Sequence, residues 1–106
     1  MNSADSFSAD YPEARAKFRE AAEAAGGALA RIQNPNKGPD GGDISTDVAW
    51  FGPSAAEKVL VLVSATHGVE GFCGSGAQVD WLRRAGLLRR GRRPHSARRS
   101  VRPHRA

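Results

Sequence analysis

The sequence predicts an α/β fold, and three observations support this prediction. A helix-like, alanine-rich stretch occupies residues 8–25, and two short strand-like stretches follow it. The apolar run of residues 59–63, Val-Leu-Val-Leu-Val, comes next and has the character of a buried strand. A glycine-rich bend and a second helix-like stretch complete an order of helix, strands, bend and helix that is typical of α/β proteins.

Local signals at both ends define the first helix, which we predict over residues 8–25. Ser8 or Asp10 can cap its N-terminus, and Pro12 suits a first turn in which no N–H is needed. The interior is rich in alanine, the best helix former. A glycine pair at positions 26 and 27 ends the helix, because glycine readily adopts the left-handed conformation found at helix ends.

Two strands are predicted after this helix. Residues 28–33 form a short strand candidate, and residues 34–42 (NPNKGPDGG) are turn-forming and separate it from the next element. Residues 45–51 show partial alternation, with Val48 and Trp50 on one face, which predicts a second strand.

The strongest strand prediction covers residues 58–64, where the run of residues 59–63 is apolar on both faces. Such a pattern suits a strand buried inside a parallel or mixed sheet. The nine residues 64–72 (SATHGVEGF) follow as a bend, and residues 76–82 have the pattern of the first turns of a helix.

The charge is distributed unevenly and divides the chain into two parts. Residues 1–82 carry six Lys or Arg and all eleven acidic residues, a net charge of −5. Residues 83–106 carry ten Arg, no Lys and no acid, a net charge of +10. We therefore predict a domain over residues 1–82. We predict a disordered basic tail over residues 83–106, because that segment has too few large aliphatic residues to offset the entropy lost on ordering.

The compartment is expected to be the cytoplasm. The single cysteine, Cys73, excludes an intrachain disulfide, and the N-terminus lacks the features of a signal peptide. No apolar run approaches the roughly 20 residues that span a bilayer, so no membrane association is expected. We interpret Cys73 as a small buried packing residue rather than a nucleophile, since no partner base is evident.

His67 and Glu70 are candidate metal ligands in the bend. Imidazole nitrogens and carboxylate oxygens both bind zinc, and glycines at 68 and 71 let the backbone fold sharply enough for the two groups to converge. The C-terminal end of a buried strand is also where open α/β sheets place their chemistry. The spacing alone favours a loop histidine beside a solvated glutamate. The position after a strand and the flanking glycines bring the metal site level with that interpretation, and both stay open at this point.

The stretch VLVLVSATHGVEGFCGSGAQVDWL, residues 59–82, resembles the first metal motif of the zinc carboxypeptidase and aspartoacylase/succinylglutamate desuccinylase superfamily. The likeness is to a bacterial branch of uncharacterised domains. FSADYPEARAKFREAAEAAGG and GGDISTDVAWFG also resemble the opening of that branch, so the resemblance covers roughly residues 7–82. It implies the N-terminal part of a zinc-exopeptidase-like mixed sheet with flanking helices.

The resemblance also implies a function and a cofactor. His67 and Glu70 match the first two Zn²⁺ ligands of an enzyme that hydrolyses an amide bond, in a peptide C-terminus or an N-acyl amino acid. Family members add a downstream histidine ligand, a general-base glutamate and arginines that hold a substrate carboxylate. We identify none of these here, because His95 and His104 lie in the arginine-rich segment without recognisable context. We therefore assign no catalytic residue and expect an inactive fragment.

The basic tail has three open interpretations. It is a solvated tail without a role, a nucleic-acid-binding arm, or the product of out-of-frame translation with a break near residues 81–88. Clustered arginines neutralise phosphates, but no aromatic residue is interleaved to stack on bases. GC-rich DNA read in the wrong frame gives this composition of Arg, Pro, Ala, Gly, Ser and His. The competing function is thus a small non-enzymatic protein whose tail binds nucleic acid.

Overall fold

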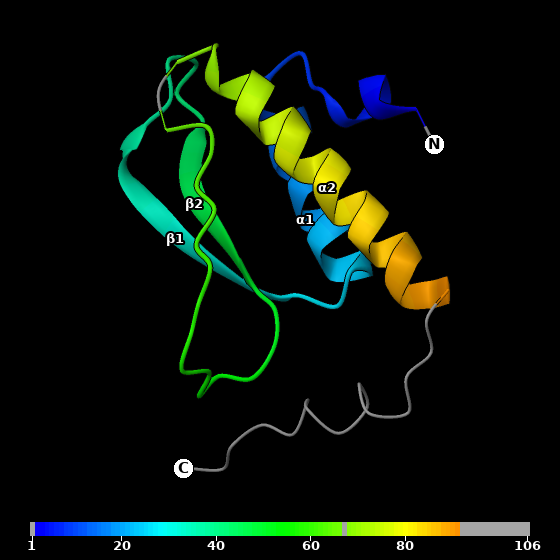
Figure 1. The fold of residues 1–106 in the computed structure, drawn as a ribbon. Coiled ribbons are helices and arrows are strands. Elements are labelled where there is room, and N and C mark those ends of the chain that lie inside the picture. Colours follow the sequence, from blue (N-terminus) through cyan, green and yellow to red (C-terminus); the bar gives the residue numbers. More distant parts are fainter. Residues whose placement is uncertain (1, 67, 92–106) are drawn as a thin grey trace.

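The computed structural model describes residues 2–66 and 68–91 and has a mixed α/β fold, as predicted (Figure 1). The element order is a short 3-10 helix η1, helix α1, strands β1 and β2, and helix α2. Their bounds are Ser3–Ser6, Tyr11–Ala24, Ala28–Lys37, Asp43–Trp50 and Gly71–Gly91. In the described ranges, neither helix combines the length and the apolar character that crossing a membrane requires.

Helix α1 begins at Tyr11, three residues after the predicted start at 8, and ends at Ala24, one residue before the predicted end at 25. Asp10 is the N-cap, and its side chain accepts a hydrogen bond of 2.9 Å from the backbone N–H of Glu13. The Glu13 carboxylate in turn accepts one of 2.8 Å from the N–H of Ala9, so two backbone donors at the helix start are satisfied. Gly26 follows the C-cap with a φ of 86°, a conformation that favours glycine.

Strands β1 and β2 form an antiparallel hairpin. The register pairs Ala28 with Trp50 and Arg31 with Asp47, and it shifts between Gln33 and Lys37. Strand β1 continues to Lys37, four residues past the predicted end at 33, so the connecting turn is shorter than predicted. The register shift surrounds Pro35, which has no N–H to donate to a regular ladder.

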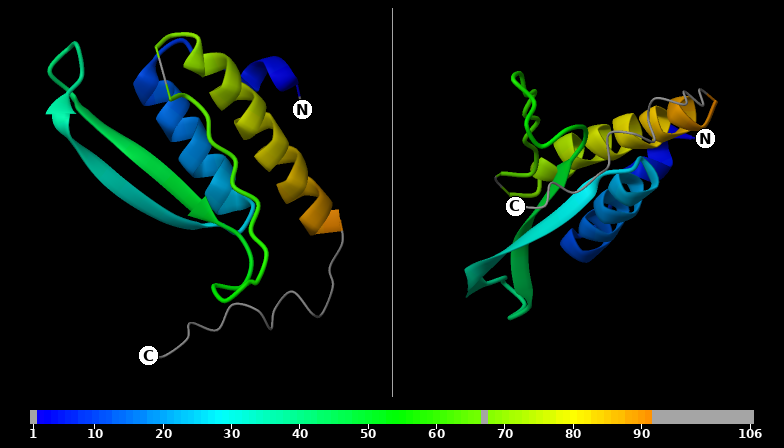
Figure 2. Two further views of the ribbon diagram at one scale, coloured as in Figure 1. Left: turned by 60° about the vertical axis from the view of Figure 1, so that its left-hand side comes forward. Right: turned by 90° about the horizontal axis from the view of Figure 1, so that it is seen from below.

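The core is small and lies mainly between the two helices. The views in Figures 1 and 2 show α1 and α2 side by side, with the hairpin packed against α1. Small side chains let the helices approach closely, because α1 contributes Ala21 and Ala22 opposite Val79 and Leu82 of α2. Further hydrophobic side chains pack around this cluster from α1, the hairpin and the residue after it, namely Phe18, Leu29, Ala49 and Phe51.

The predicted buried strand at residues 58–64 is not a strand in the structure. This stretch runs from the loop after β2 back to α2 without joining the sheet, which among the described residues contains only β1 and β2. Its five apolar side chains, residues 59–63, are between 51% and 79% exposed. A buried strand needs a hydrogen-bonded neighbour and cover on both faces. The described residues supply neither, so the prediction of a buried strand is wrong for this chain.

The second helix is longer than predicted at both ends. Helix α2 begins at Gly71 rather than 76 and continues to Gly91. Residues 83–91, which the composition predicts as tail, therefore belong to a helix, in keeping with the good helix propensity of Arg, Leu and Ala. The other residues predicted as tail, 92–106, lie outside the described residues, and the prediction of disorder there stays a prediction.

A polar network fastens the N-terminal segment to α2. The Asp80 carboxylate accepts hydrogen bonds from the hydroxyls of Ser3 and Ser6, at 3.3 and 3.2 Å, and from Arg84 Nε at 2.9 Å. Arg84 also donates to the Ser3 hydroxyl at 2.7 Å, and Arg83 donates to that of Ser6 at 3.3 Å. The first two residues of the predicted tail thus make specific contacts within the domain.

Candidate functional site

The bend between residues 64 and 71 turns the chain sharply from the apolar stretch into α2. Ala65 has a φ of 59°, a left-handed conformation that is costly for a residue with a side chain. A Cβ built on Gly71 would lie 2.8 Å from the Cα of Ala65, so the chain can pass this closely only because position 71 is glycine. The N–H of Gly71 donates to the carbonyl of Gly68 at 2.9 Å and closes the turn.

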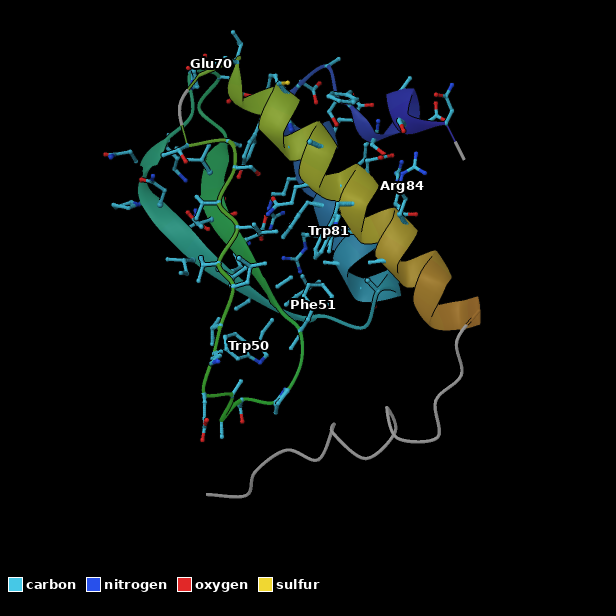
Figure 3. The ribbon with its side chains drawn as sticks, viewed as in Figure 1. Trp50, Phe51, Glu70, Trp81 and Arg84 are labelled. Atoms are coloured by element: carbon cyan, nitrogen blue, oxygen red, sulfur yellow. The ribbon has the colours of Figure 1, made fainter. Side chains whose placement is uncertain are left out.

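Glu70 is the predicted metal ligand that the structure describes. It is exposed and immediately precedes α2, at the opposite end of the molecule from Trp50 and Phe51 (Figure 3). A negative charge is favourable beside the first turn of a helix, where the backbone N–H groups point outward. The carboxylate is accessible to solvent at the bend.

His67, the other predicted ligand, lies outside the described residues, so its distance from Glu70 stays a prediction. Among residues 2–66 and 68–91, no three or more His, Cys, Asp or Glu side chains gather closely enough to hold a metal ion. The described side chains thus supply one donor of the predicted pair, whereas a structural or catalytic zinc site takes three or four protein ligands.

Cys73 is exposed, which corrects the prediction of a buried packing residue. It lies in the first turn of α2, where its N–H donates to the carbonyl of Glu70 at 3.2 Å. The residues that pass over this turn, Ser64 and Ala65, lie beside its glycines and not beside Cys73. Cβ atoms built on Gly71 and Gly74 would contact Ala65 and Ser64.

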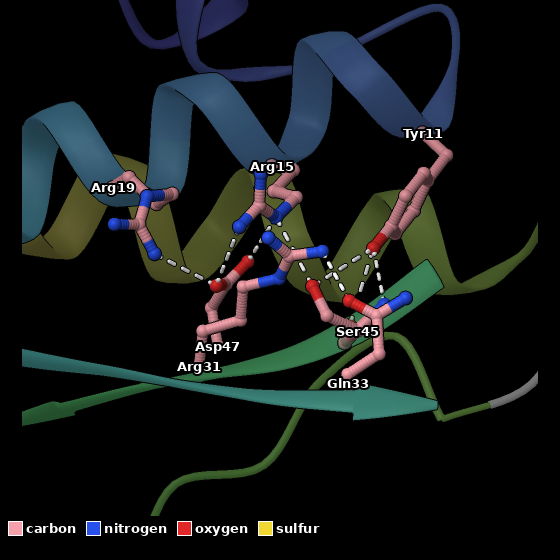
Figure 4. Close-up of polar contacts among 7 residues, drawn as sticks. All are labelled: Tyr11, Arg15, Arg19, Arg31, Gln33, Ser45 and Asp47. Atoms are coloured by element: carbon pink, nitrogen blue, oxygen red, sulfur yellow. Dashed lines mark hydrogen bonds and ion pairs between the residues drawn. The ribbon is translucent and has the colours of Figure 1, made fainter. Parts of the chain in front are cut away.

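A cluster of polar side chains between α1 and β2 was not predicted from the sequence (Figure 4). Arg15 Nε lies 2.8 Å from Asp47 Oδ2, and Arg19 Nη1 lies 2.9 Å from Asp47 Oδ1. Arg15 also donates to the Ser45 hydroxyl at 3.2 Å. The hydroxyl of Tyr11 accepts a hydrogen bond of 2.8 Å from the N–H of Ser45. The cluster holds the helix on the hairpin.

The only sequence signal for this cluster was the spacing of Arg15 and Arg19, which puts them on one face of a helix. Nothing in the sequence indicated that Asp47, about thirty positions away, would lie opposite that face. The two guanidinium groups are directed at a carboxylate within the protein, so the cluster joins α1 to the hairpin.

Comparison with known proteins gives one family. Residues 7–95 match the family described as "Protein of unknown function (DUF2817)". No curated protein and no solved structure matches the chain. The match includes all of α1, the hairpin, the bend and α2, and it extends beyond Arg83. Because the match covers most of its length, the chain belongs to the DUF2817 family.

Proposed function

We propose that residues 58–82 form the first part of the metal site of a zinc-dependent hydrolase that cleaves an amide bond. His67 and Glu70 would be the first two ligands, and the substrate would be a peptide C-terminus or an N-acyl amino acid. The observation that carries the proposal is the exposed carboxylate of Glu70 at a sharp bend between an apolar stretch and a helix. The resemblance of this stretch to the first metal motif of zinc carboxypeptidases and aspartoacylases supplies the chemistry.

The bend itself supports the proposal, because its backbone geometry is demanding. Ala65 adopts a left-handed conformation, and Gly71 passes too close to it to carry a side chain. Strained backbone of this kind persists where the surrounding structure holds it, and it is concentrated at functional sites. Here the bend ends with Glu70, directly before the start of α2.

The described residues fit such a site only in part. A bound zinc ion would lower the pKa of its water and polarise the scissile carbonyl. This chain would contribute Glu70 and His67 to the ion, and among the described residues no three His, Cys, Asp or Glu side chains gather closely enough to hold it. We identify no general base and no arginine placed to hold a substrate carboxylate. The chain as it stands is therefore expected to bind zinc weakly and to hydrolyse nothing.

The test is zinc binding by the whole chain, measured by isothermal titration calorimetry. We expect weak binding that is lost in His67→Ala and reduced in Glu70→Gln. The matched control is Glu57→Gln, which removes another exposed carboxylate just before the apolar stretch. Zinc binding that is unchanged in His67→Ala, or equally reduced in the control, would contradict the proposal.

Activity provides a second test. The chain is incubated with zinc and N-acyl amino acids or peptides, and release of the free amine is measured. We expect none above the rate with zinc alone. Zinc-dependent cleavage that His67→Ala abolishes would show that the site is complete in this chain, and our expectation of inactivity would then be wrong.

A further inference from the structure

The apolar stretch of residues 59–63 has a self-complementary sequence, and no hydrogen bond joins the backbone groups of its three valines to another described residue. We infer that it pairs with the same stretch of a second copy of this chain, as antiparallel strands related by a twofold axis at Val61. This inference does not rest on the proposed zinc site, because it uses neither His67 nor Glu70.

One edge of the stretch is held by α2. Gln78 Nε2 donates to the carbonyl of Leu62 at 3.2 Å, and Gln78 Oε1 accepts from the Ser64 hydroxyl at 2.7 Å. In an extended chain, the N–H and C=O groups of successive residues point to opposite edges. In such a conformation the backbone groups of Leu60 would point to the same side as the Leu62 carbonyl, and those of the three valines would point to the opposite side.

The other edge carries backbone groups that are not used within the described chain. No hydrogen bond joins the N–H or C=O groups of Val59, Val61 or Val63 to another described residue. The side chains of these three valines are 53%, 73% and 77% exposed, so little of the described chain covers them. Exposed, uncharged edges of this kind are templates for pairing with another strand.

The sequence of the stretch fits an antiparallel copy of itself. Val-Leu-Val-Leu-Val reads the same in both directions, so a twofold axis at Val61 places valine opposite valine and leucine opposite leucine. In this register the three valines of each copy would exchange backbone hydrogen bonds, through the edge that is open.

Charge favours the antiparallel arrangement over a parallel one. In the antiparallel register Lys58 lies opposite Ser64, so no like charges meet. A parallel pairing in register would put Lys58 opposite Lys58, which is destabilising. A pair that uses the same surface on both copies also closes as a dimer.

The chain's own C-terminal residues, 92–106, are unsuitable to cover the apolar stretch, because Val101 is their one large aliphatic residue.

The first test measures the mass of the chain by light scattering after gel filtration over a range of concentrations. We expect a dimer that dissociates on dilution. Val61→Lys would put two like charges together at the axis and should weaken dimerisation by about tenfold or more. The control is Val69→Lys, at a side chain that is 80% exposed but outside the stretch, and it should leave dimerisation unchanged. A monomer at all concentrations, or a dimer that Val61→Lys leaves intact, would overturn the inference.

The second test reports the register and does not depend on Val61→Lys being folded. In a Cys73→Ser background, Leu60→Cys and Leu62→Cys chains are prepared separately, then mixed and oxidised. In the inferred pair, Leu60 lies directly opposite Leu62 of the other copy, with Cβ atoms about 4.5–5.5 Å apart, whereas like positions lie about 7–8 Å apart on the diagonal. The mixture should therefore form disulfides at least several times faster than either chain alone. Equal rates would show non-specific association and overturn the inference.

Discussion

Arg15 and Asp47 form the central contact between helix α1 and the hairpin. Arg15 Nε lies 2.8 Å from Asp47 Oδ2, and the Asp47 side chain is only 7% exposed. Arg19, one turn along the helix, reaches the other carboxylate oxygen at 2.9 Å. A nearly buried carboxylate thus receives two guanidinium groups, which hold one helix face at one position of strand β2 (Figure 4).

The first prediction concerns this carboxylate. Asp47→Asn keeps the shape of the side chain but removes its charge, so two arginines would face a neutral amide between α1 and β2. We expect the free energy of unfolding to fall by about 2 kcal/mol, less than for a fully buried pair because both arginines reach solvent. The free energy of unfolding is measured by urea denaturation, with circular dichroism as the signal. Asp43→Asn, at an exposed carboxylate paired with Lys37, is the control and should change stability little. Equal effects of the two substitutions would refute a special role for Asp47.

The second prediction concerns the bend. Gly71→Ala would place a Cβ 2.8 Å from the backbone of Ala65, which must shift, and overpacking of this kind costs about 1–3 kcal/mol. Gly68→Ala is the control, because its Cβ would meet only the flexible end of the Glu70 side chain at 3.2 Å. We expect Gly71→Ala to lower the thermal midpoint and Gly68→Ala to leave it nearly unchanged. The reverse order would show that the close approach at Gly71 is not required.

The third prediction concerns acid stability. A hydrogen bond from Arg84 chiefly, with further ones from Ser3 and Ser6, lowers the pKa of Asp80 below its ordinary value of 3.8. Because the pKa is lower in the folded chain, the contribution of Asp80 is fully present above about pH 4–5 and is lost as the pH falls through the lowered pKa. Asp80→Asn should therefore reduce stability at pH 7 and flatten its decline in acid.

The measurement for Asp80 is denaturant unfolding at several pH values between about 2 and 7. Asp5→Asn, at an exposed carboxylate in η1, is the matched control and should retain the decline of the unmodified chain. If Asp80→Asn and the unmodified chain lose stability in parallel as the pH falls, the network around Asp80 does not contribute in the expected way.

The fourth prediction concerns the coding DNA. Arg83 and Arg84 contact the N-terminal segment and Asp80, and the family match continues to residue 95. If the basic segment arises from a frame change, we therefore expect the reading frame to change after Arg84. The start of the predicted range for this break, residues 81–88, is then excluded. Reading the DNA downstream in the other two frames should reveal mixed composition, a histidine and a glutamate. The absence of an α/β pattern in both frames would favour a genuine basic tail and the nucleic-acid-binding alternative.

The sequence alone determined the features that depend on near neighbours in the chain. The limits of α1 followed from Asp10, Pro12 and the glycine pair at 26 and 27, because caps and helix ends are satisfied within a few residues. The alternation around Val48 indicated β2 for the same reason. The glycines on either side of Glu70 likewise indicated a sharp bend at this carboxylate, and the chain does turn there.

Only the tertiary structure decided which distant groups meet. The hydrophobic run at residues 59–63 indicates a strand, but burial of a strand depends on a neighbour that the run itself does not specify, and the stretch is exposed. The burial of Asp47 between Arg15 and Arg19 likewise depends on how α1 crosses the hairpin. Local hydrogen bonds and steric limits are encoded within a few residues. Burial and ion pairing between elements depend instead on the packing of the whole chain, which no short pattern contains.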